Sequence, residues 1–328
     1  MKIKDKEFIL VTGCAGFIGF HLTKLLLSKN KYIIGVDMIN HYYDVKLKNS
    51  RLKELKRISN KKLIFYKCDI QNFKKMDTIF KKYKITKVVN LAAQAGVRDA
   101  IRKPKKYLNY NINGFLNILN LCKDYQIKHL IYASTSSVYG LNKKTPFSEK
   151  DKTDSQNQFY AVTKKTNELM ANVWGQIYNL PTTGLRFFTV YGPWGRPDMA
   201  LFKFTKNIIN GDPIYLHNYG NHMRDFTYID DIVNGIYLSL KKTPQAPSIS
   251  KIYNLGFGKA VSLKYFLNLI EKYTNKKAIV VNLPMQLGDI LKTNADISLA
   301  KKELGYKPNT KIDNGLKNFI KWYTNFYN

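Results

Sequence analysis

The chain has 328 residues, of which 45% are hydrophobic and 13% are aromatic. This composition excludes a mainly disordered chain and supports a core large enough for two packed units. A membrane span needs about 20 consecutive apolar residues. The best candidate, Phe17–Leu27, is interrupted by His21, Thr23 and Lys24, so we expect no membrane-spanning helix.

The formal net charge of +31 would favour a nucleic-acid or anionic membrane partner if it were concentrated in one region. Only seven of the 54 basic residues are arginines, and the lysines are spread over nearly every expected helix and turn. Phosphate clamping and base readout usually use arginine. We therefore interpret the lysines as solvated surface and expect neither a nucleic acid nor a membrane as partner.

The cysteines and the first apolar run indicate the compartment. Cys14, Cys68 and Cys122 are far apart and lack the paired spacing of a metal site, which fits a reducing compartment without a disulfide framework. Phe8–Val11 is too short for a signal-peptide core and runs into a glycine-rich turn. We expect a cytoplasmic protein. The histidines form no ligand set, so no metal is expected.

Short apolar runs alternate with lysine-rich amphipathic segments in the first half of the chain. These runs lack period-two alternation and are joined by connections of helix length, which predicts a parallel sheet covered on both faces. The expected strands are Phe8–Val11, Tyr32–Val36, Leu63–Tyr66, Lys87–Leu91 and Leu130–Ala133. The pattern is typical of a Rossmann-type, doubly wound α/β domain.

The character of the chain changes after a long helix expected over about Phe159–Tyr178 and a strand over Thr183–Phe188. A turn-rich loop, Tyr191–Pro197, follows. Further helices are expected over Met199–Asn210, Ile229–Lys241, Leu263–Tyr273 and Gly315–Phe326. We predict a Rossmann domain over residues 1–188 and a smaller α/β substrate domain over 189–328, part of which returns to pack on the first.

A glycine-rich turn follows the first expected strand. Gly13, Gly16 and Gly19 have the spacing G-x-x-G-x-x-G and, with Phe17 and Ile18, open a helix that runs to about Ser28. Glycines permit a tight turn and close approach of a pyrophosphate, while the helix N-terminus offers unpaired N–H groups. The strand, turn and helix together predict a dinucleotide site.

The ends of the next three strands extend this site. Asp37 can bind the adenosine ribose hydroxyls and repel a 2′-phosphate, which favours NAD over NADP. Asp69 and Ile70 follow the third strand like the adenine-flanking pair of such sites. The fourth strand ends in residues with mostly small side chains, Leu91, Ala92, Ala93 and Gln94. Ordinary loop and strand packing is the alternative interpretation of these last two segments.

A Tyr-x-x-x-Lys pair places an ammonium one helical turn from a phenol, whose pKa it can lower from about 10. In so lysine-rich a chain the pattern is uninformative alone, since about three matches are expected by chance. Matches begin at Tyr42, Tyr83, Tyr139, Tyr160, Tyr237 and Tyr273. Only Tyr160 and Lys164 begin a long uninterrupted helix soon after the fifth strand, which ends in Ser134–Ser137 at the carboxyl edge of the sheet. A hydroxyl, a phenol and an ammonium should therefore converge there.

Over nearly its whole length the chain resembles the extended short-chain dehydrogenases/reductases of the sugar-nucleotide epimerase group, and within it the UDP-glucuronate 4-epimerases. The matching segments are Thr12–Gly19, Ala92–Arg98, Ser134–Gly140, Leu185–Ala200 (LRFFTVYGPWGRPDMA), Arg224–Ile232 (RDFTYIDDI) and Pro284–Asp289. Met38 departs from the family, in which Asn often follows the acidic residue.

The resemblance implies a mechanism in which Tyr160 removes the proton of the sugar 4-hydroxyl as C4 passes hydride to NAD⁺. Lys164 would tune Tyr160 and hold the nicotinamide ribose, and Thr135 would hydrogen-bond the 4-oxygen. Asn111 is implied in the cofactor site, and Arg98 and Thr189 in the substrate site. Arg224 would approach the phosphates and Asp289 the uridine ribose. The family also implies a homodimer, built on helices near Tyr107–Asp124 and Phe159–Tyr178.

The choice of sugar depends on the residues after Thr135. A 4-keto uronic acid loses CO₂ readily, and the related decarboxylases carry an acidic residue shortly after the Thr. Here Ser136 and Ser137 follow, and both can donate to a carboxylate, while Arg196 can pair with it. This favours interconversion of UDP-glucuronate and UDP-galacturonate. Loop anchoring is the alternative role of Arg196, and Arg186 is interpreted as structural.

Asp230 and Asp231 precede a helix and are interpreted as caps rather than as a catalytic pair. The alternatives for the whole protein are epimerisation of a neutral UDP-hexose, decarboxylation of UDP-glucuronate, or a nucleotide-sensing or RNA-binding protein on a dehydrogenase scaffold. The presence of Thr135, Tyr160 and Lys164 argues against the last of these.

Overall fold

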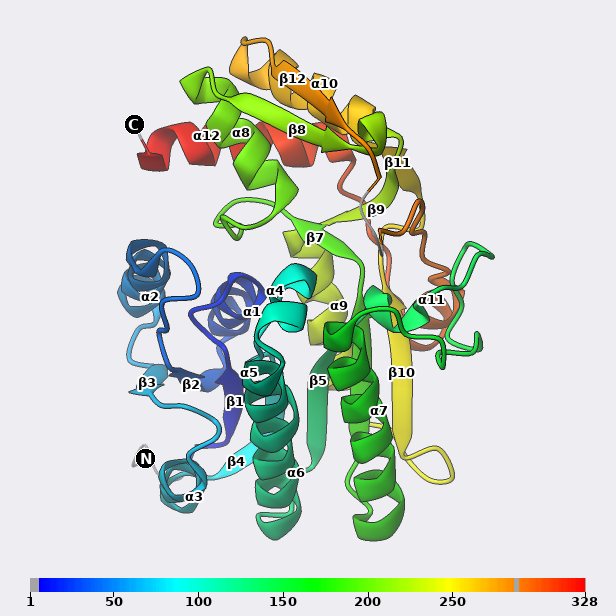
Figure 1. The fold of residues 1–328 in the computed structure, drawn as a ribbon. Coiled ribbons are helices and arrows are strands. Elements are labelled where there is room, and N and C mark those ends of the chain that lie inside the picture. Colours follow the sequence, from blue (N-terminus) through cyan, green and yellow to red (C-terminus); the bar gives the residue numbers. More distant parts are fainter. Residues whose placement is uncertain (1–5, 286–288, 328) are drawn as a thin grey trace.

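Parallel strands form the central sheet of the computed structural model, which describes residues 6–285 and 289–327. Within these residues the sheet has seven strands in the order β10-β6-β5-β4-β1-β2-β3, and every pair is parallel. The strands are β1 (Phe8–Thr12), β2 (Tyr32–Asp37), β3 (Leu63–Lys67), β4 (Ile85–Asn90), β5 (His129–Thr135), β6 (Thr182–Phe187) and β10 (Ser250–Leu255). The expected Rossmann-type α/β class is confirmed (Figure 1).

The strands are apolar on both faces because helices cover both. Neighbouring residues such as Leu10 and Val11 on β1 belong to different core clusters. On the face of Leu10 lie helices α3 (Phe73–Lys82), α6 (Gly114–Asp124) and α7 (Phe159–Tyr178). On the face of Val11 lie α1 (Phe17–Ser28), α2 (Val45–Ile58) and α9 (Ile229–Lys241). This arrangement explains the missing period-two alternation.

The strand order reverses between β1 and β4, which are neighbours although two strands separate them in the chain. At this point the Thr12 hydroxyl donates to Asn90 Oδ1 over 2.6 Å and accepts from the Ala92 N–H at 3.1 Å. In open α/β sheets, ligands bind outside the carboxyl ends of the strands at such a reversal. The fold therefore places its binding crevice beside Thr12.

A second layer covers the carboxyl end of the sheet, at the top of Figure 1. It contains a three-stranded sheet and a two-stranded sheet. Their strands are β7 (Thr189–Tyr191), β8 (Pro213–His217), β9 (Met223–Tyr228), β11 (Ala260–Ser262) and β12 (Ile279–Leu283). The accompanying helices are α8 (Ala200–Asn210), α10 (Leu263–Thr274) and α12 (Ile312–Tyr327), whereas α11 (Ser298–Leu304) packs against β10. Between these elements, β10 returns to the central sheet and pairs with β6.

The segment before α6 differs from the single helix that the sequence suggests. After α4 (Val97–Arg102), the short α5 (Pro104–Tyr107) passes into a π-helical turn, η2 (Leu108–Asn113), before α6 begins. Such turns are rare and often lie at functional sites. This one contains Asn111, whose side chain is buried.

The capping interpretation of Asp230 and Asp231 is wrong in its detail. Helix α9 has Tyr228 as its N-cap residue, and no side chain caps it. Both aspartates lie in its first turn, where they complement the helix dipole. Asp231 also accepts the backbone N–H groups of Asn309 and Thr310, at 3.1 and 3.0 Å, and so ties the segment before α12 to α9.

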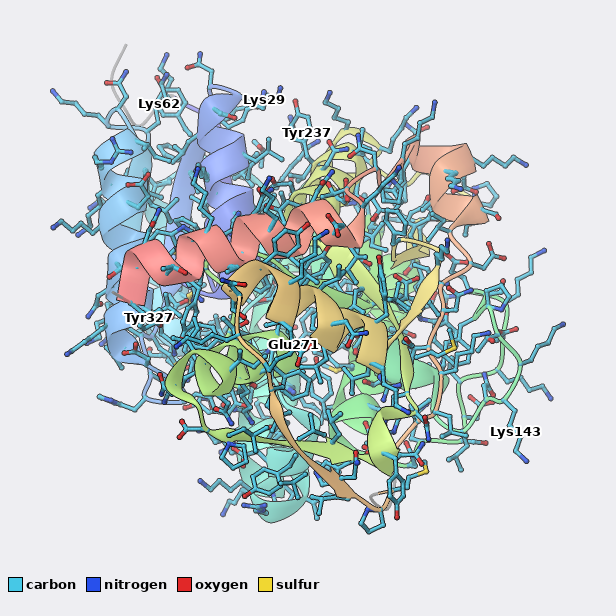
Figure 2. The ribbon with its side chains drawn as sticks, turned by 90° about the horizontal axis from the view of Figure 1, so that it is seen from above. Lys29, Lys62, Lys143, Tyr237, Glu271 and Tyr327 are labelled. Atoms are coloured by element: carbon cyan, nitrogen blue, oxygen red, sulfur yellow. The ribbon has the colours of Figure 1, made fainter. Side chains whose placement is uncertain are left out.

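Most lysines extend from the surface in all directions, as Figure 2 shows for Lys29, Lys62 and Lys143. Among the described lysines, Lys48 and Lys164 are the buried ones. No helix in residues 6–285 and 289–327 is long and apolar enough to cross a membrane.

Candidate active site

A cavity of about 1170 Å³ lies at the carboxyl edge of the central sheet. It brings together residues from motifs that are far apart in the sequence. Those lining it are Gly13, Gly16, Phe17, Ile18, Gly19, Asp37, Asp69, Ile70, Leu91, Ala92, Ala93, Gln94, Thr135, Ser136, Ser137, Tyr160, Lys164, Thr189, Arg196, Arg224 and Asp289. The expected cofactor and substrate residues therefore face one shared space.

The glycine-rich turn leaves no room for a side chain at Gly13 or Gly19. Gly13 has a φ of +70°, and a Cβ there would lie 2.9 Å from the Ala92 nitrogen. A Cβ on Gly19 would collide with the Gly13 carbonyl. Gly16 caps α1 without a side-chain hydrogen bond, so the first N–H groups of the helix remain available at the cavity wall. This cradle suits a pyrophosphate.

Asp37 ends β2 beside this cradle. Its two carboxylate oxygens accept the N–H groups of Ile39 and Ala15, at 2.9 and 3.1 Å. Burial raises the pKa of Asp37, while these hydrogen bonds and the charge of Lys48 oppose the rise. The carboxylate is thereby oriented at the point where a ribose would lie.

Lys48 also lines the cavity, although it belongs to no recognised motif. Its ammonium donates to the carbonyl and to the side-chain oxygen of Asn40, both at 2.6 Å. Burial lowers its pKa to about 8, a shift that the charge of Asp37 partly offsets. Among so many lysines, no sequence signal separates this one from the others.

Asn111 does not line the cavity but supports a residue that does. Its side-chain oxygen accepts the Gln94 N–H at 2.8 Å, and its amide donates to the Gln94 carbonyl at 3.0 Å. The amide also donates to the Thr163 hydroxyl on α7. The π-helical turn thus fixes the loop after β4 against the helix that carries Tyr160.

Tyr160 and Lys164 lie one turn apart at the start of α7, facing the end of β5. Lys164 donates to the Ala133 carbonyl over 2.9 Å, and burial lowers its pKa to about 8. Burial raises the pKa of Tyr160, while the positive charge of Arg196 and a hydrogen bond with Thr135 act to lower it. Burial is the largest of these effects, so the pKa of Tyr160 is raised overall in the cofactor-free protein.

Thr135 also shapes the turn that follows it. Its hydroxyl donates to the Ser137 hydroxyl and accepts the Ser137 N–H, both at 3.2 Å. This closes a 3₁₀ turn, η3 (Ser136–Tyr139). Ser136 and Ser137 consequently line the cavity beside Thr135.

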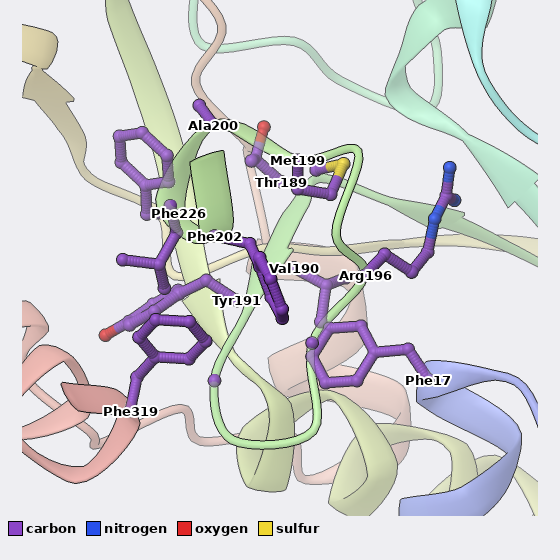
Figure 3. A pocket seen from close by; sticks show the side chains of 13 residues that line it. Phe17, Thr189, Val190, Tyr191, Arg196, Met199, Ala200, Phe202, Phe226 and Phe319 are labelled. Atoms are coloured by element: carbon purple, nitrogen blue, oxygen red, sulfur yellow. The ribbon is translucent and has the colours of Figure 1, made fainter. Parts of the chain in front are cut away.

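Arg196 lies at the cavity in a loop between β7 and α8. Its guanidinium donates to both carboxylate oxygens of Asp198, at 3.0 and 2.5 Å. A small cavity of about 40 Å³ adjoins this loop. Figure 3 shows the Arg196 side chain extending away from the aromatic rings of Phe202, Phe226 and Phe319.

The far end of the cavity is lined by β8, β9 and the segment around Asp289. Arg224 donates to the carbonyls of Met223 and Leu291, at 3.0 and 3.2 Å. Asp289 approaches the ring of the buried His222 at 3.8 Å, and His217 lies close to His222. No motif in the sequence marks His222 or His217, because their proximity arises only in the fold.

Two expectations cannot be placed fully. The side chain of Arg98 lies outside the described residues, as do residues 286–288 of the Pro284–Asp289 motif. Within the described ranges, no group of three or more His, Cys, Asp or Glu side chains is arranged to hold a metal ion.

Known proteins resemble this chain along nearly its whole length. The family model for GDP-mannose 4,6 dehydratase matches residues 10–319. Protein CapI of Staphylococcus aureus is 47% identical, covering 97% of this chain and 99% of its own. UDP-glucuronate 4-epimerase 4 of Arabidopsis thaliana is 44% identical, covering 97% of this chain and 76% of its own.

A crystal structure of UDP-glucuronic acid 4-epimerase from Bacillus cereus, in complex with UDP-glucuronic acid and NAD, aligns with a TM-score of 0.91 and 32% identity. The alignment covers 98% of this chain and 100% of that one. Fold and cavity together define a Rossmann-type α/β protein of the extended short-chain dehydrogenase/reductase class. The chain belongs to the family that the GDP-mannose 4,6 dehydratase model describes.

Proposed function

We propose that this protein is an NAD-dependent 4-epimerase that interconverts UDP-glucuronate and UDP-galacturonate. One observation carries the proposal: a single cavity holds the glycine cradle, the Thr135, Tyr160 and Lys164 constellation, and the paired hydroxyls of Ser136 and Ser137. The relatives named as UDP-glucuronate 4-epimerases support this choice of substrate.

The cradle fits NAD on its own geometry. Gly13 packs so closely on the backbone of Ala92 that a Cβ would clash with it, and the uncapped N-terminus of α1 leaves N–H groups for a pyrophosphate. Asp37 would hold the adenosine ribose, while Asp69, Ile70 and the segment Leu91–Gln94 would flank the remainder. When bound, NAD⁺ supplies the hydride acceptor.

Tyr160 acts as the base on the sugar 4-hydroxyl. At pH 7 a lysine with a pKa of about 8 is still protonated, so Lys164 supplies a positive charge one turn from the phenol. Thr135 hydrogen-bonds the 4-oxygen as charge develops on it. The 4-keto sugar then turns within the cavity, and Tyr160 returns the proton after hydrogen has been added to the opposite face of C4.

The hydroxyls after Thr135 restrain the uronate carboxylate. Ser136 and Ser137 donate to it without repulsion, and Arg196 pairs with it in place of Asp198. These contacts oppose the loss of CO₂ from the 4-keto intermediate. Thr189 lines the same part of the cavity, while Arg224 and Asp289 hold the nucleotide at its far end.

The protein forms a homodimer in this proposal, through the helical segment near Tyr107–Asp124 and through α7, which carries an exposed apolar stripe. Val162, Leu169, Val173 and Ile177 are 40%, 56%, 42% and 64% exposed and recur at helical spacing. Such a stripe on a surface helix is typical of an interface. Light scattering should give twice the chain mass, and Leu169→Glu should yield monomers. A wild-type monomer would contradict this part of the proposal.

We also propose a division into domains over residues 1–188 and 189–328, and the pairing of β10 with β6 supports the return of part of the second domain to the first. A cytoplasmic location is proposed because all three cysteines are buried and free.

The function is tested by incubating the purified protein with UDP-glucuronate, without added reductant, and following the sugar signals by proton NMR. We expect UDP-galacturonate to appear with no release of CO₂. A pentose product would indicate a decarboxylase instead, and an unchanged spectrum would contradict the proposal and redirect the assay to neutral UDP-hexoses.

A further inference from the structure

Arg51 on α2 is a buried arginine that no ion pair explains. Its side chain is wholly inaccessible to solvent, and no described carboxylate forms a salt bridge with it. Buried arginines are normally paired with carboxylates, because an uncompensated interior charge is costly. The burial of a guanidinium at this position therefore needs another explanation.

The guanidinium joins two loops that are far apart in the chain. One terminal nitrogen donates to the carbonyl of Ala15 over 3.0 Å and to the Tyr43 hydroxyl over 2.7 Å. The other donates to the carbonyls of Trp194 and Gly195, at 2.5 and 3.1 Å. Ala15 belongs to the glycine-rich turn, whereas Trp194 and Gly195 immediately precede Arg196.

The loop that receives these bonds has an unusual backbone. Gly192 has a φ of +141° and Trp194 a φ of +60°, a left-handed conformation that a tryptophan seldom adopts. The indole packs against Phe20 of α1, with ring centroids 5.2 Å apart. Figure 3 shows how this loop carries the Arg196 side chain. The bonds from Arg51 thus help to hold the backbone that positions Arg196 at the cavity.

On the other side, the bonds reach the cofactor cradle. The Ala15 peptide donates its N–H to Asp37 over 3.1 Å and accepts Arg51 through its carbonyl. An unbroken series of hydrogen bonds and peptide links therefore runs from Asp37 through Ala15, Arg51 and Gly195 to Arg196.

We propose that Arg51 is a positioning residue that couples occupancy of the cradle to the conformation of residues 192–196. A ligand that orders the glycine-rich turn also fixes the Arg51 guanidinium, which is bonded to Ala15. Ordering residues 192–196 then costs less conformational entropy, because the guanidinium that binds them is already fixed. A cofactor bound in the cradle then strengthens binding of the uronate through Arg196, and the effect is reciprocal. The identity of both ligands rests on the proposed function.

The first test uses hydrogen exchange on the wild-type chain, with and without NAD and with no sugar nucleotide present. We expect NAD to slow exchange of the backbone amides within residues 192–196, which are those of Gly192, Trp194, Gly195 and Arg196. In Arg51→Lys, which keeps the charge but lacks the two-nitrogen fork, this protection should disappear. In Arg57→Lys, a substitution of an exposed arginine on the same helix, the protection by NAD should persist. Wild-type exchange that NAD leaves unchanged would overturn the proposal even if Arg51 variants fail to fold.

The second test measures the affinity for UDP-glucuronate with and without NAD in a Tyr160→Phe background, where turnover is blocked. We expect NAD to tighten binding by about fivefold or more, and Arg51→Lys to reduce this factor to less than twofold. UDP, which has no uronate carboxylate, should show no dependence on Arg51.

A merely structural role predicts a different result. If Arg51→Lys weakened UDP-glucuronate binding equally with and without NAD, the coupling factor would be unchanged and the proposal would be wrong. If UDP-glucuronate did not bind at all, the proposed function would fail, whereas the hydrogen-exchange result would still decide the coupling.

Discussion

Glu168 receives a two-pronged hydrogen bond from Arg186, with both N···O distances at 2.9 Å, and both side chains are almost inaccessible to solvent. The Ser134 hydroxyl donates to the same carboxylate at 2.6 Å. Because Glu168 lies one turn after Lys164 and Ser134 directly precedes Thr135, this pair braces α7 against the ends of β5 and β6.

Removing Glu168 should leave an uncompensated buried guanidinium. We expect Glu168→Ala to lower the free energy of unfolding by about 3–5 kcal/mol, measured by urea denaturation. The matched control is Glu54→Ala, which breaks an exposed pair with Arg57 and should cause no measurable loss. If the two substitutions lowered the free energy of unfolding equally, the buried pair would contribute no more to stability than the exposed pair.

Tyr160→Phe should abolish turnover of UDP-glucuronate while leaving the fold intact. The substitution removes one hydroxyl from the end of a partly buried ring, so packing is preserved and only the proton transfer is lost. General acid–base groups contribute about 10²–10⁴-fold to rates, and we expect a loss in this range. Activity is followed by proton NMR, and unchanged circular dichroism is the control. Retention of full activity would rule out Tyr160 as the base.

The lowered pKa of Lys164 predicts a pH dependence of stability in the cofactor-free protein. Burial lowers this pKa to about 8, against about 10.4 in an unfolded chain. Below pH 8 both states hold the proton, and the cost of the buried ammonium is fully present. Between pH 8 and about 10.4 only the unfolded chain binds it, so folding stability rises with pH in this window.

Lys164→Met lacks this titration and is the natural comparison. We expect wild type to gain up to about 3 kcal/mol relative to this variant between pH 7 and pH 10, measured by urea denaturation at both values. Any constant offset from the lost hydrogen bond to Ala133 cancels in this difference. Parallel pH profiles for the two proteins would contradict the lowered pKa.

Arg196→Gln tests the restraint on the uronate carboxylate. A hydrogen bond to a charged group contributes about 1.5–3 kcal/mol, so kcat/KM for UDP-glucuronate should fall about 10- to 100-fold. The share of pentose among the products should rise, because the 4-keto acid is held less firmly. Arg57→Gln serves as the control. Unchanged turnover of the acid would instead favour a neutral UDP-hexose as the substrate.

The elements that could be predicted are those with a strong local pattern. Helices α1, α7 and α9 begin and end close to the expected residues, because apolar periodicity and flanking turn residues mark them. The parallel sheet followed from the lack of period-two alternation. The π-helical turn around Asn111 was missed, because its altered hydrogen-bond spacing leaves no trace in the apolar pattern.

The residues that lie together at the site were predicted where a motif or a resemblance marked them, as with Gly13, Tyr160 and Arg224. Arg51, Lys48 and His222 were missed because their significance arises from contacts between segments distant in the chain. The sequence likewise does not indicate that β10 extends the central sheet, since strand pairing depends on the fold as a whole.

The most direct test of the account follows the hydrogen at C4 of the sugar. UDP-glucuronate carrying deuterium at C4 should give UDP-galacturonate that retains the deuterium at C4. In the proposed mechanism the same hydrogen leaves this carbon and returns to its opposite face within one cavity. Mass spectrometry and proton NMR of the product measure this. Replacement of the deuterium by solvent hydrogen would contradict this path of the hydrogen.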